Sequence, residues 1–171
     1  IKGTIGLGLP AVSMGLLTMV ISPFQAATLL IIPSMVTNIW QLFAEGRVLQ
    51  LIRRFGLLLI GIIVGSIWSV FPTLGHSDFN SEALLGGMLA LYGLYGLFAK
   101  SMPNLSKYEN WLSPIMGYLV GALTVATGVV VIPVVPYLQT LNLQRDDLVQ
   151  SLGLAFTTST ICLAVFLHQN P

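Results

Sequence analysis

Residues 110–144 read NWLSPIMGYLVGALTVATGVVVIPVVPYLQTLNLQ, a stretch without a single Asp, Glu, Lys or Arg. Residues 3–44, 55–77, 83–99 and 148–171 are equally free of charge. A hydrocarbon core ~30 Å thick needs only ~20 such residues in a helix. Charged residues make up 8% of the 171-residue chain, whereas soluble domains carry about a quarter. The sequence therefore predicts a polytopic integral membrane protein.

The spans are predicted to be helices rather than strands of a barrel. In lipid every backbone N–H and C=O needs an internal partner, which leaves helices or a closed barrel. Barrel strands alternate apolar and polar residues, whereas residues 57–60 and 129–132 are apolar on every side. We therefore expect an all-α fold.

The composition argues against several functional classes. A net charge of +1 lacks the clustered basic residues of nucleic-acid-binding proteins. Cys162 is the sole cysteine, which excludes an internal disulfide and a cysteine-based metal cluster. His76 and His168 have no second ligand at a diagnostic spacing. We therefore expect no nucleic-acid partner, no metal and no cofactor. We also expect no enzymatic activity, because no nucleophile–base pair is evident.

Charged residues gather between the apolar runs and predict the topology. Segments 45–54 and 100–110 are basic and are placed in the cytoplasm, because short cytoplasmic loops are enriched in Lys and Arg. The acidic segment 74–82 then lies outside. Single helices of ordinary length fit three apolar runs, namely 55–73, 82–99 and 148–168.

Two apolar segments are predicted to contain breaks. As one helix, residues 111–141 would be ~46 Å long, which is too long for one untilted crossing. This segment contains Gly128, Pro133 and Pro136, and proline removes a helix hydrogen bond. The segment 3–44 carries similar punctuation, at Gly6, Gly8, Pro10, Gly15, Pro23 and Pro33. Irregular backbone at membrane depth is tolerated only where protein surrounds it or it lines a cavity.

The two broken segments match one another in pattern. Three pairs of stretches align: 8–13 with 128–133, 22–27 with 143–148, and 34–38 with 155–159. Interrupted hydrophobic segments at corresponding places in two halves are typical of secondary transporters. We therefore divide the chain into a first half, 1–107, with a broken helix and three spans, and the start of a second, 108–171, with a broken helix and one span.

The halves could be inverted or parallel. If 110–141 enters from the cytoplasm and turns back at residues 124–128, Arg145 is cytoplasmic and the helix at 148–168 runs outward. The matching helix at 24–44 runs inward, so these halves are inverted. If 110–141 crosses fully, the halves are parallel. The segment suits two half-spans of ~15 residues, since a full crossing takes ~20. We expect inverted repeats.

The sequence resembles the TauE/SafE sulfite exporter family along most of its length. Four stretches carry the resemblance: GLGLP at 6–10, IIPSMVTNIWQ at 31–41, GVVVIP at 128–133 and LQRDDLVQSLGLAFT at 143–157. The resemblance implies a transporter of small anions such as sulfite or organosulfonates, built from two related halves. Family members usually have about seven or eight spans, so we expect this to be a partial chain. The expected location is a bacterial inner membrane, with the lipid bilayer as a partner.

Neutral donors are expected to bind the anion near mid-membrane. Half-helix N-termini offer free N–H groups and a partial positive charge, and glycine permits close approach. Helical spacing places Ser34, Thr37, Asn38 and Gln41 on one face. The candidate substrate-binding residues are Gly6, Gly8, Ser34, Thr37, Asn38, Gln41, Thr124, Thr127, Gly128, Gln150, Thr158 and Ser159.

The same polar residues have a structural interpretation. Ser and Thr hydroxyls often bond their own helix backbone, and amides can hold membrane helices together. A membrane scaffold or assembly protein that does not transport is therefore the alternative function. The spacings Gly61-x-x-x-Gly65 and Gly117-x-x-x-Gly121 are typical of closely packed membrane helices. We expect them to pack within the chain, and a homo-oligomer is left open.

Overall fold

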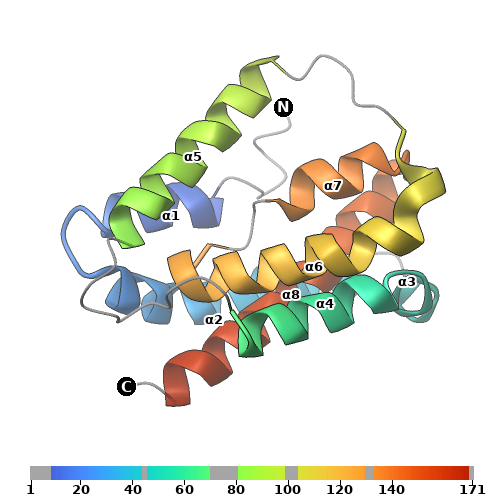
Figure 1. The fold of residues 1–171 in the computed structure, drawn as a ribbon. Helices are drawn as coiled ribbons and strands as arrows, with labels where there is room; N and C mark the ends of the chain where they lie inside the picture. The colour runs from blue at the N-terminus through green and yellow to red at the C-terminus, as the bar shows by residue number, and fades with distance from the viewer. Residues whose placement is uncertain (1–8, 44–45, 70–80, 99–103, 130–132, 170–171) are drawn as a thin grey trace.

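A computed structural model describes residues 9–43, 46–69, 81–98, 104–129 and 133–169 (Figure 1). Every regular element in these residues is helical, which confirms the all-α expectation there. In chain order the elements are α1 Leu9–Leu17, α2 Pro23–Phe43, α3 Val48–Arg54, α4 Gly56–Ile67, α5 Ser81–Phe98, the 3-10 helix η2 Ser106–Tyr108, α6 Glu109–Thr127, α7 Val134–Thr140 and α8 Arg145–Gln169.

Two of these helices, α2 and α8, are long and apolar enough to cross a membrane. The pair α3 and α4, bent by 70° at its junction, raises the number to three if the pair counts as one span. These numbers rest on length and composition and apply to the described residues. The helix expected at 24–44 is found within one residue of its predicted bounds, whereas the one expected at 55–73 already ends at Ile67.

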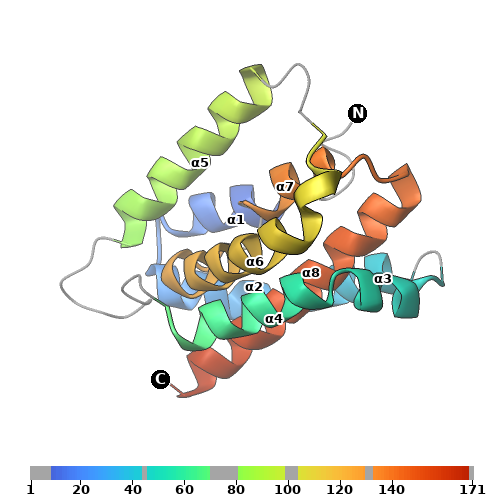
Figure 2. The same ribbon diagram turned by 45° about the vertical axis from the view of Figure 1, so that its right-hand side comes forward.

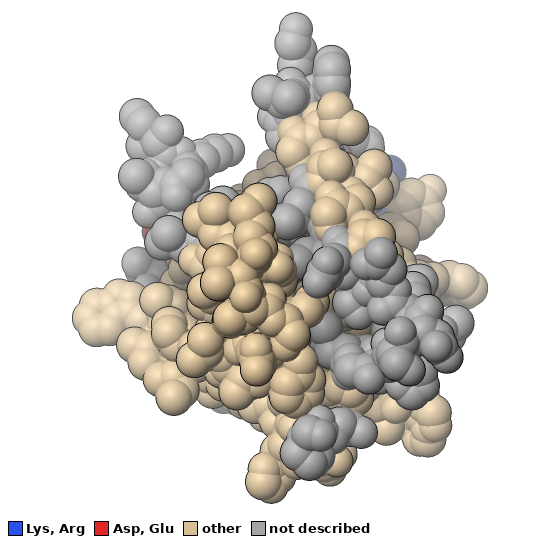
Figure 3. Space-filling model, turned by 90° about the vertical axis from the view of Figure 1, so that its left-hand side faces the viewer, with Lys and Arg blue, Asp and Glu red and all other residues tan. Residues whose placement is uncertain are grey.

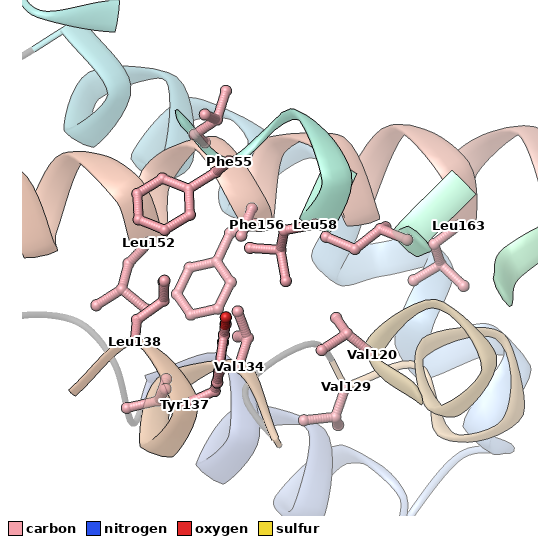
Figure 4. Packing of buried hydrophobic residues seen from close by; sticks show 14 of the residues in the cluster. Phe55, Leu58, Val120, Val129, Val134, Tyr137, Leu138, Leu152, Phe156 and Leu163 are labelled. Carbon is pink, nitrogen blue, oxygen red and sulfur yellow. The ribbon is translucent and has the colours of Figure 1, made fainter. Parts of the chain in front are cut away.

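Four helices, α2, α4, α6 and α8, form the body of the protein and lie alongside one another in both ribbon views (Figures 1 and 2). Helix α8 packs against α2, α4, α6 and α7 and is the central element. Helix α5 stands away from this group, packing against α1 and α6. The apolar core gathers side chains from α4, α6, α7 and α8, with Phe156 among Leu58, Val134 and Leu138 (Figure 4).

The first broken segment contains its break between α1 and α2. Helix α1 ends at Leu17, and the chain turns before Ser22 accepts a 3.3 Å hydrogen bond from the Gln25 backbone N–H. Pro23 then takes the first helical position, where its missing N–H costs nothing. Pro33 does not interrupt α2, in agreement with the single helix expected at 24–44. Membrane helices tolerate an internal proline when neighbouring groups satisfy the freed backbone.

The second broken segment forms a hairpin. Helix α6 ends at Thr127, and Gly128 adopts a left-handed φ of 74° with its N–H bonded to the Thr124 carbonyl at 2.8 Å. Helix α7 then runs back toward the start of α6. The end of α7 lies beside that start, because the Leu105 N–H donates to the Thr140 carbonyl at 3.0 Å. Both ends of the hairpin therefore lie together. The two arms contain helices of 19 and 7 residues, which corrects the expected equal halves. Helix α6 continues through Gly117 and Gly121 and ends where Gly128 adopts the left-handed conformation that is typical after a helix C-terminus.

A short helix, a turn and a long helix occur twice, as α1–α2 and α7–α8. In the first copy the carbonyl of Ser22 accepts from the N–H of Ala26, and in the second the carbonyl of Gln144 accepts from that of Leu148. The two helix starts therefore differ by 122 positions, where the sequence alignment used 121. The order of elements in the two segments is therefore alike, with the starts of the long helices 122 residues apart.

Helices α4 and α6 run in the same direction and touch through glycine. A Cβ atom at Gly65 would lie 2.1 Å from the Tyr118 carbonyl oxygen, and one at Gly121 would lie 2.1 Å from that of Ile62. Gly61 and Gly117 are equally close to the opposite backbone. The expectation that these spacings pack within the chain is confirmed.

Replacing Gly65 or Gly121 by alanine is expected to destabilise the protein by about 1–3 kcal/mol, because the added methyl forces the two backbones apart. The measurement is the thermal unfolding midpoint of the purified protein in detergent. Gly86→Ala in α5 is the matched control, because nothing lies within 4 Å of its Cβ position. Equal midpoints for Gly65→Ala and Gly86→Ala would contradict the close crossing.

Candidate functional site

The contact between α2 and α8 joins the two polar clusters that the sequence singles out. The Asn38 Nδ2 donates to the Thr160 Oγ1 at 3.2 Å, and that hydroxyl donates to the Phe156 carbonyl at 2.7 Å. Both side chains are buried. The Asn38 side-chain amide therefore hydrogen-bonds to another helix. The Thr160 hydroxyl acts as both donor and acceptor.

Gln150 makes a second link between the same helices. Its Nε2 donates to the Leu42 carbonyl at 2.8 Å, one of the last carbonyls of α2, which have no partner inside their own helix. The side chain is fully buried, and its Oε1 has no hydrogen-bond partner among the described residues. Gly153 permits this approach, because a Cβ there would lie 2.7 Å from the Leu42 backbone nitrogen.

These contacts set the relative direction of the two helices. Position 38 of α2 meets position 160 of α8, whereas position 42 meets position 150. As the residue number increases along α2, the number of the contacting residue in α8 decreases. Helices α2 and α8 are antiparallel.

Ser159 has a buried hydroxyl with no hydrogen-bond partner in the described part of the chain. An unmade hydrogen bond at a buried group costs about 1–3 kcal/mol. A hydroxyl can both donate and accept. Ser159 is therefore the strongest candidate on α8 for a ligand contact.

At the break after α6 the polar groups satisfy the chain itself. The hydroxyls of Thr124 and Thr127 donate to the Val120 and Leu123 carbonyls, each at 2.7 Å. The Val129 N–H donates to the Thr127 Oγ1 at 3.3 Å. These residues are buried. Their hydrogen bonds fit the structural interpretation, in which hydroxyls stabilise the end of a helix.

The remaining predicted site residues are scattered. Thr37 is exposed and donates to the Pro33 and Ser34 carbonyls. Ser34 and Gln41 are half-buried, as is Thr158, whose hydroxyl donates to the Leu154 carbonyl at 3.0 Å. The four polar residues of α2 therefore have different surroundings. Gly6 and Gly8 lie outside the described residues.

Thr160 is the contact residue that the sequence prediction missed. The alignment paired Asn38 with Ser159 by using an offset of 121. The helix starts give an offset of 122, which pairs Asn38 with Thr160, the residue to which it is hydrogen-bonded. At the start of α2 the Ser22 hydroxyl accepts from the Gln25 N–H, whereas at the start of α8 Gln144 contributes its backbone carbonyl.

The face shown in Figure 3 carries little blue or red among the described residues. Arg54 forms a bidentate ion pair with Glu109, with both N–O distances 2.8 Å, and Arg47 pairs with Asp147 at 3.2 Å. Each pair joins the first half of the chain to the second. The α2–α8 interface itself uses neutral side chains.

A double-mutant cycle tests the interhelical hydrogen bond. Asn38→Leu and Thr160→Val are each expected to destabilise the protein, with a coupling of about 0.6 and at most about 1.7 kcal/mol, the range measured for such bonds in membranes. The measurement is unfolding in mixed micelles. Thr28→Val is the control, because Thr28 is exposed and bonds its own helix. Additive effects of the two changes would contradict the contact.

Comparison with known proteins identifies the family. The family model described as Sulfite exporter TauE/SafE matches residues 1–170. No curated protein and no solved structure matches the chain. Because the family match covers nearly all 171 residues, the chain belongs to the TauE/SafE sulfite exporter family.

Proposed function

We propose that the protein is a secondary transporter that exports a small anion, either sulfite or an organosulfonate, across a bacterial inner membrane. The family match carries this proposal, since the family is one of membrane transporters. The apolar helices α2 and α8 support a location within the bilayer. In this function α8 contributes polar side chains to the substrate site.

The proposed architecture is a pair of inverted repeats within a polytopic protein. Antiparallel α2 and α8 support it, because parallel halves would align these helices in one direction. The adjacent ends of the α6–α7 hairpin support it as well, since they return the chain to the side from which it started. In a twofold arrangement, equivalent residues meet at the axis. The proposed repeat makes Asn38 and Thr160 equivalent by the offset of the helix starts, and the two are hydrogen-bonded.

The proposed substrate site lies beside Ser159, which shares a face of α8 with the buried core residues Leu152 and Leu163. The Ser159 hydroxyl is a buried donor with no partner in the described residues, so an oxyanion there would satisfy it. Asn38, Gln41 and Gln150 are further residues proposed for the site. Thr124, Thr127 and Gly128 would contribute from the hairpin, as would Gly6 and Gly8 from the first segment. Neutral donors bind an anion while still allowing its release.

The alternative, a scaffold that does not transport, has its own support. Asn38–Thr160 and Gln150–Leu42 both act between helices and would hold the protein together without any substrate. The two functions differ at Ser159. A scaffold gains nothing from a hydroxyl that bonds nothing, whereas a transporter would use it.

Ser159→Ala is expected to weaken the apparent affinity for sulfite about tenfold or more, because a hydrogen bond to a charged group contributes about 1.5–3 kcal/mol. The measurement is the concentration dependence of labelled sulfite flux in proteoliposomes. Thermal stability should stay equal to wild type or rise. Thr28→Ala is the control with unchanged flux. Unaltered affinity for Ser159→Ala would overturn the site, and no saturable flux in the full-length protein would overturn the function.

Labelling by a membrane-impermeant maleimide tests the inverted arrangement. Asn142 lies exposed between α7 and α8, so Asn142→Cys in a Cys162→Ser background should react from the cytoplasmic side. Trp68→Cys, at the other end of α4, is the control that should react from outside. Reaction of Asn142→Cys from the outside alone would exclude inverted halves.

A further inference from the structure

Helix α3 is a separate short element at the charged end of the protein. It comprises Val48–Arg54 and meets α4 at Phe55 with a bend of 70°. Leu51 and Phe55 are buried and attach it to the core. Membrane-spanning helices tilt by about 20° on average. With α4 near that orientation, α3 lies closer to the membrane plane than to its normal.

Ion pairs fix both ends of α3 against the second half of the chain. Arg47, which precedes the helix, pairs with Asp147 at 3.2 Å, and Arg54 at its end pairs with Glu109 at 2.8 Å. The Arg54 guanidinium also lies 5.3 Å from the centre of the Phe55 ring. These two arginines are therefore committed to contacts within the protein.

The other side of α3 has a different character. Leu49 and Ile52 are 63% and 40% exposed. Arg53 is also exposed, and it makes no ion pair with any described residue. Positions 49, 52 and 53 are separated by three and four residues, so they share one helix face. This face combines exposed apolar side chains with an uncompensated positive charge.

We infer that α3 lies in the membrane interface and that Arg53 binds the phosphate of an anionic lipid. In this position Leu49 and Ile52 enter the boundary between head groups and acyl chains, as in other amphipathic interfacial helices. Anionic lipid in the cytoplasmic leaflet attracts basic residues next to a span. The inference requires the membrane location and does not depend on the transport proposal.

Charge distinguishes a lipid from a second copy of the chain as the occupant. Among the described residues at this end of the protein, Lys107 and Arg145 are also exposed, and Asp146 is the exposed acid outside the two ion pairs. A symmetric dimer would bring Arg53 faces together and place like charges opposite one another. An anionic lipid instead neutralises the excess positive charge.

Native mass spectrometry of the delipidated full-length protein titrated with phosphatidylglycerol or phosphatidylcholine tests the inference. Wild type should retain phosphatidylglycerol preferentially. Arg53→Gln should weaken that retention about fivefold, because the attraction of one basic residue to an anionic membrane surface contributes about 1 kcal/mol. Arg53→Lys, which keeps the positive charge, should retain phosphatidylglycerol almost as well as wild type. Arg145→Gln is the matched control, since Arg145 is exposed but next to Asp146 and Asp147.

Spin labels provide a second measurement on the apolar side chains. A nitroxide at Leu49→Cys, in a Cys162→Ser background, should report head-group depth from its accessibility to oxygen and to a water-soluble relaxant. Retention of phosphatidylglycerol that is unchanged by Arg53→Gln would overturn the inference. A label at position 49 that lies in bulk water would also overturn the inference. A label whose accessibility depends on protein density would overturn it as well, because this would indicate contact with a second copy of the chain.

Discussion

Backbone hydrogen bonding at helix ends is the constraint on which this structure depends. A helix that ends in or near lipid has carbonyls and N–H groups that water cannot reach. Side chains from other elements meet this need here. Gln150 donates to the Leu42 carbonyl at the end of α2, and the Tyr118 hydroxyl donates to that of Trp68 after α4. Each of these two helix ends is thus stabilised by a side chain from a helix that is distant in the sequence.

The constraint explains why polar residues in this sequence are ambiguous. A glutamine in an apolar run can signal a substrate contact or a partner for a helix end, and Gln150 has one atom in each situation. Its Nε2 is bonded to α2, whereas its Oε1 has no described partner. Thr127 is committed entirely to the turn at Gly128. Ser159 alone among the predicted serines and threonines of α8 has a buried hydroxyl without a described bond.

Much of the fold could be predicted because it depends on local signals. Charge-free runs locate α2, α4, α5 and α8, Gly128 predicts the turn after α6, and the Gly65 and Gly121 spacings predict the α4–α6 contact. Helix α3 lies in the basic segment 45–54, which was expected to be a loop. The polar contacts depend instead on register between distant segments. The sequence alignment paired Asn38 with Ser159, whereas the residue to which Asn38 is hydrogen-bonded is Thr160. The continuity of α2 through Pro33 agrees with the helix expected at 24–44.

The hydrogen bond between Asn38 and Thr160 has a consequence for biosynthesis. Its partners are 122 residues apart, and chains grow at ~5–20 residues per second, so α2 waits about 6 to 24 s for α8. During that time the Asn38 amide lacks its final partner. A buried amide without a hydrogen bond is unfavourable in an apolar environment. The emerging chain therefore needs temporary protection for α2, from the insertion machinery or from α1, until the second half arrives.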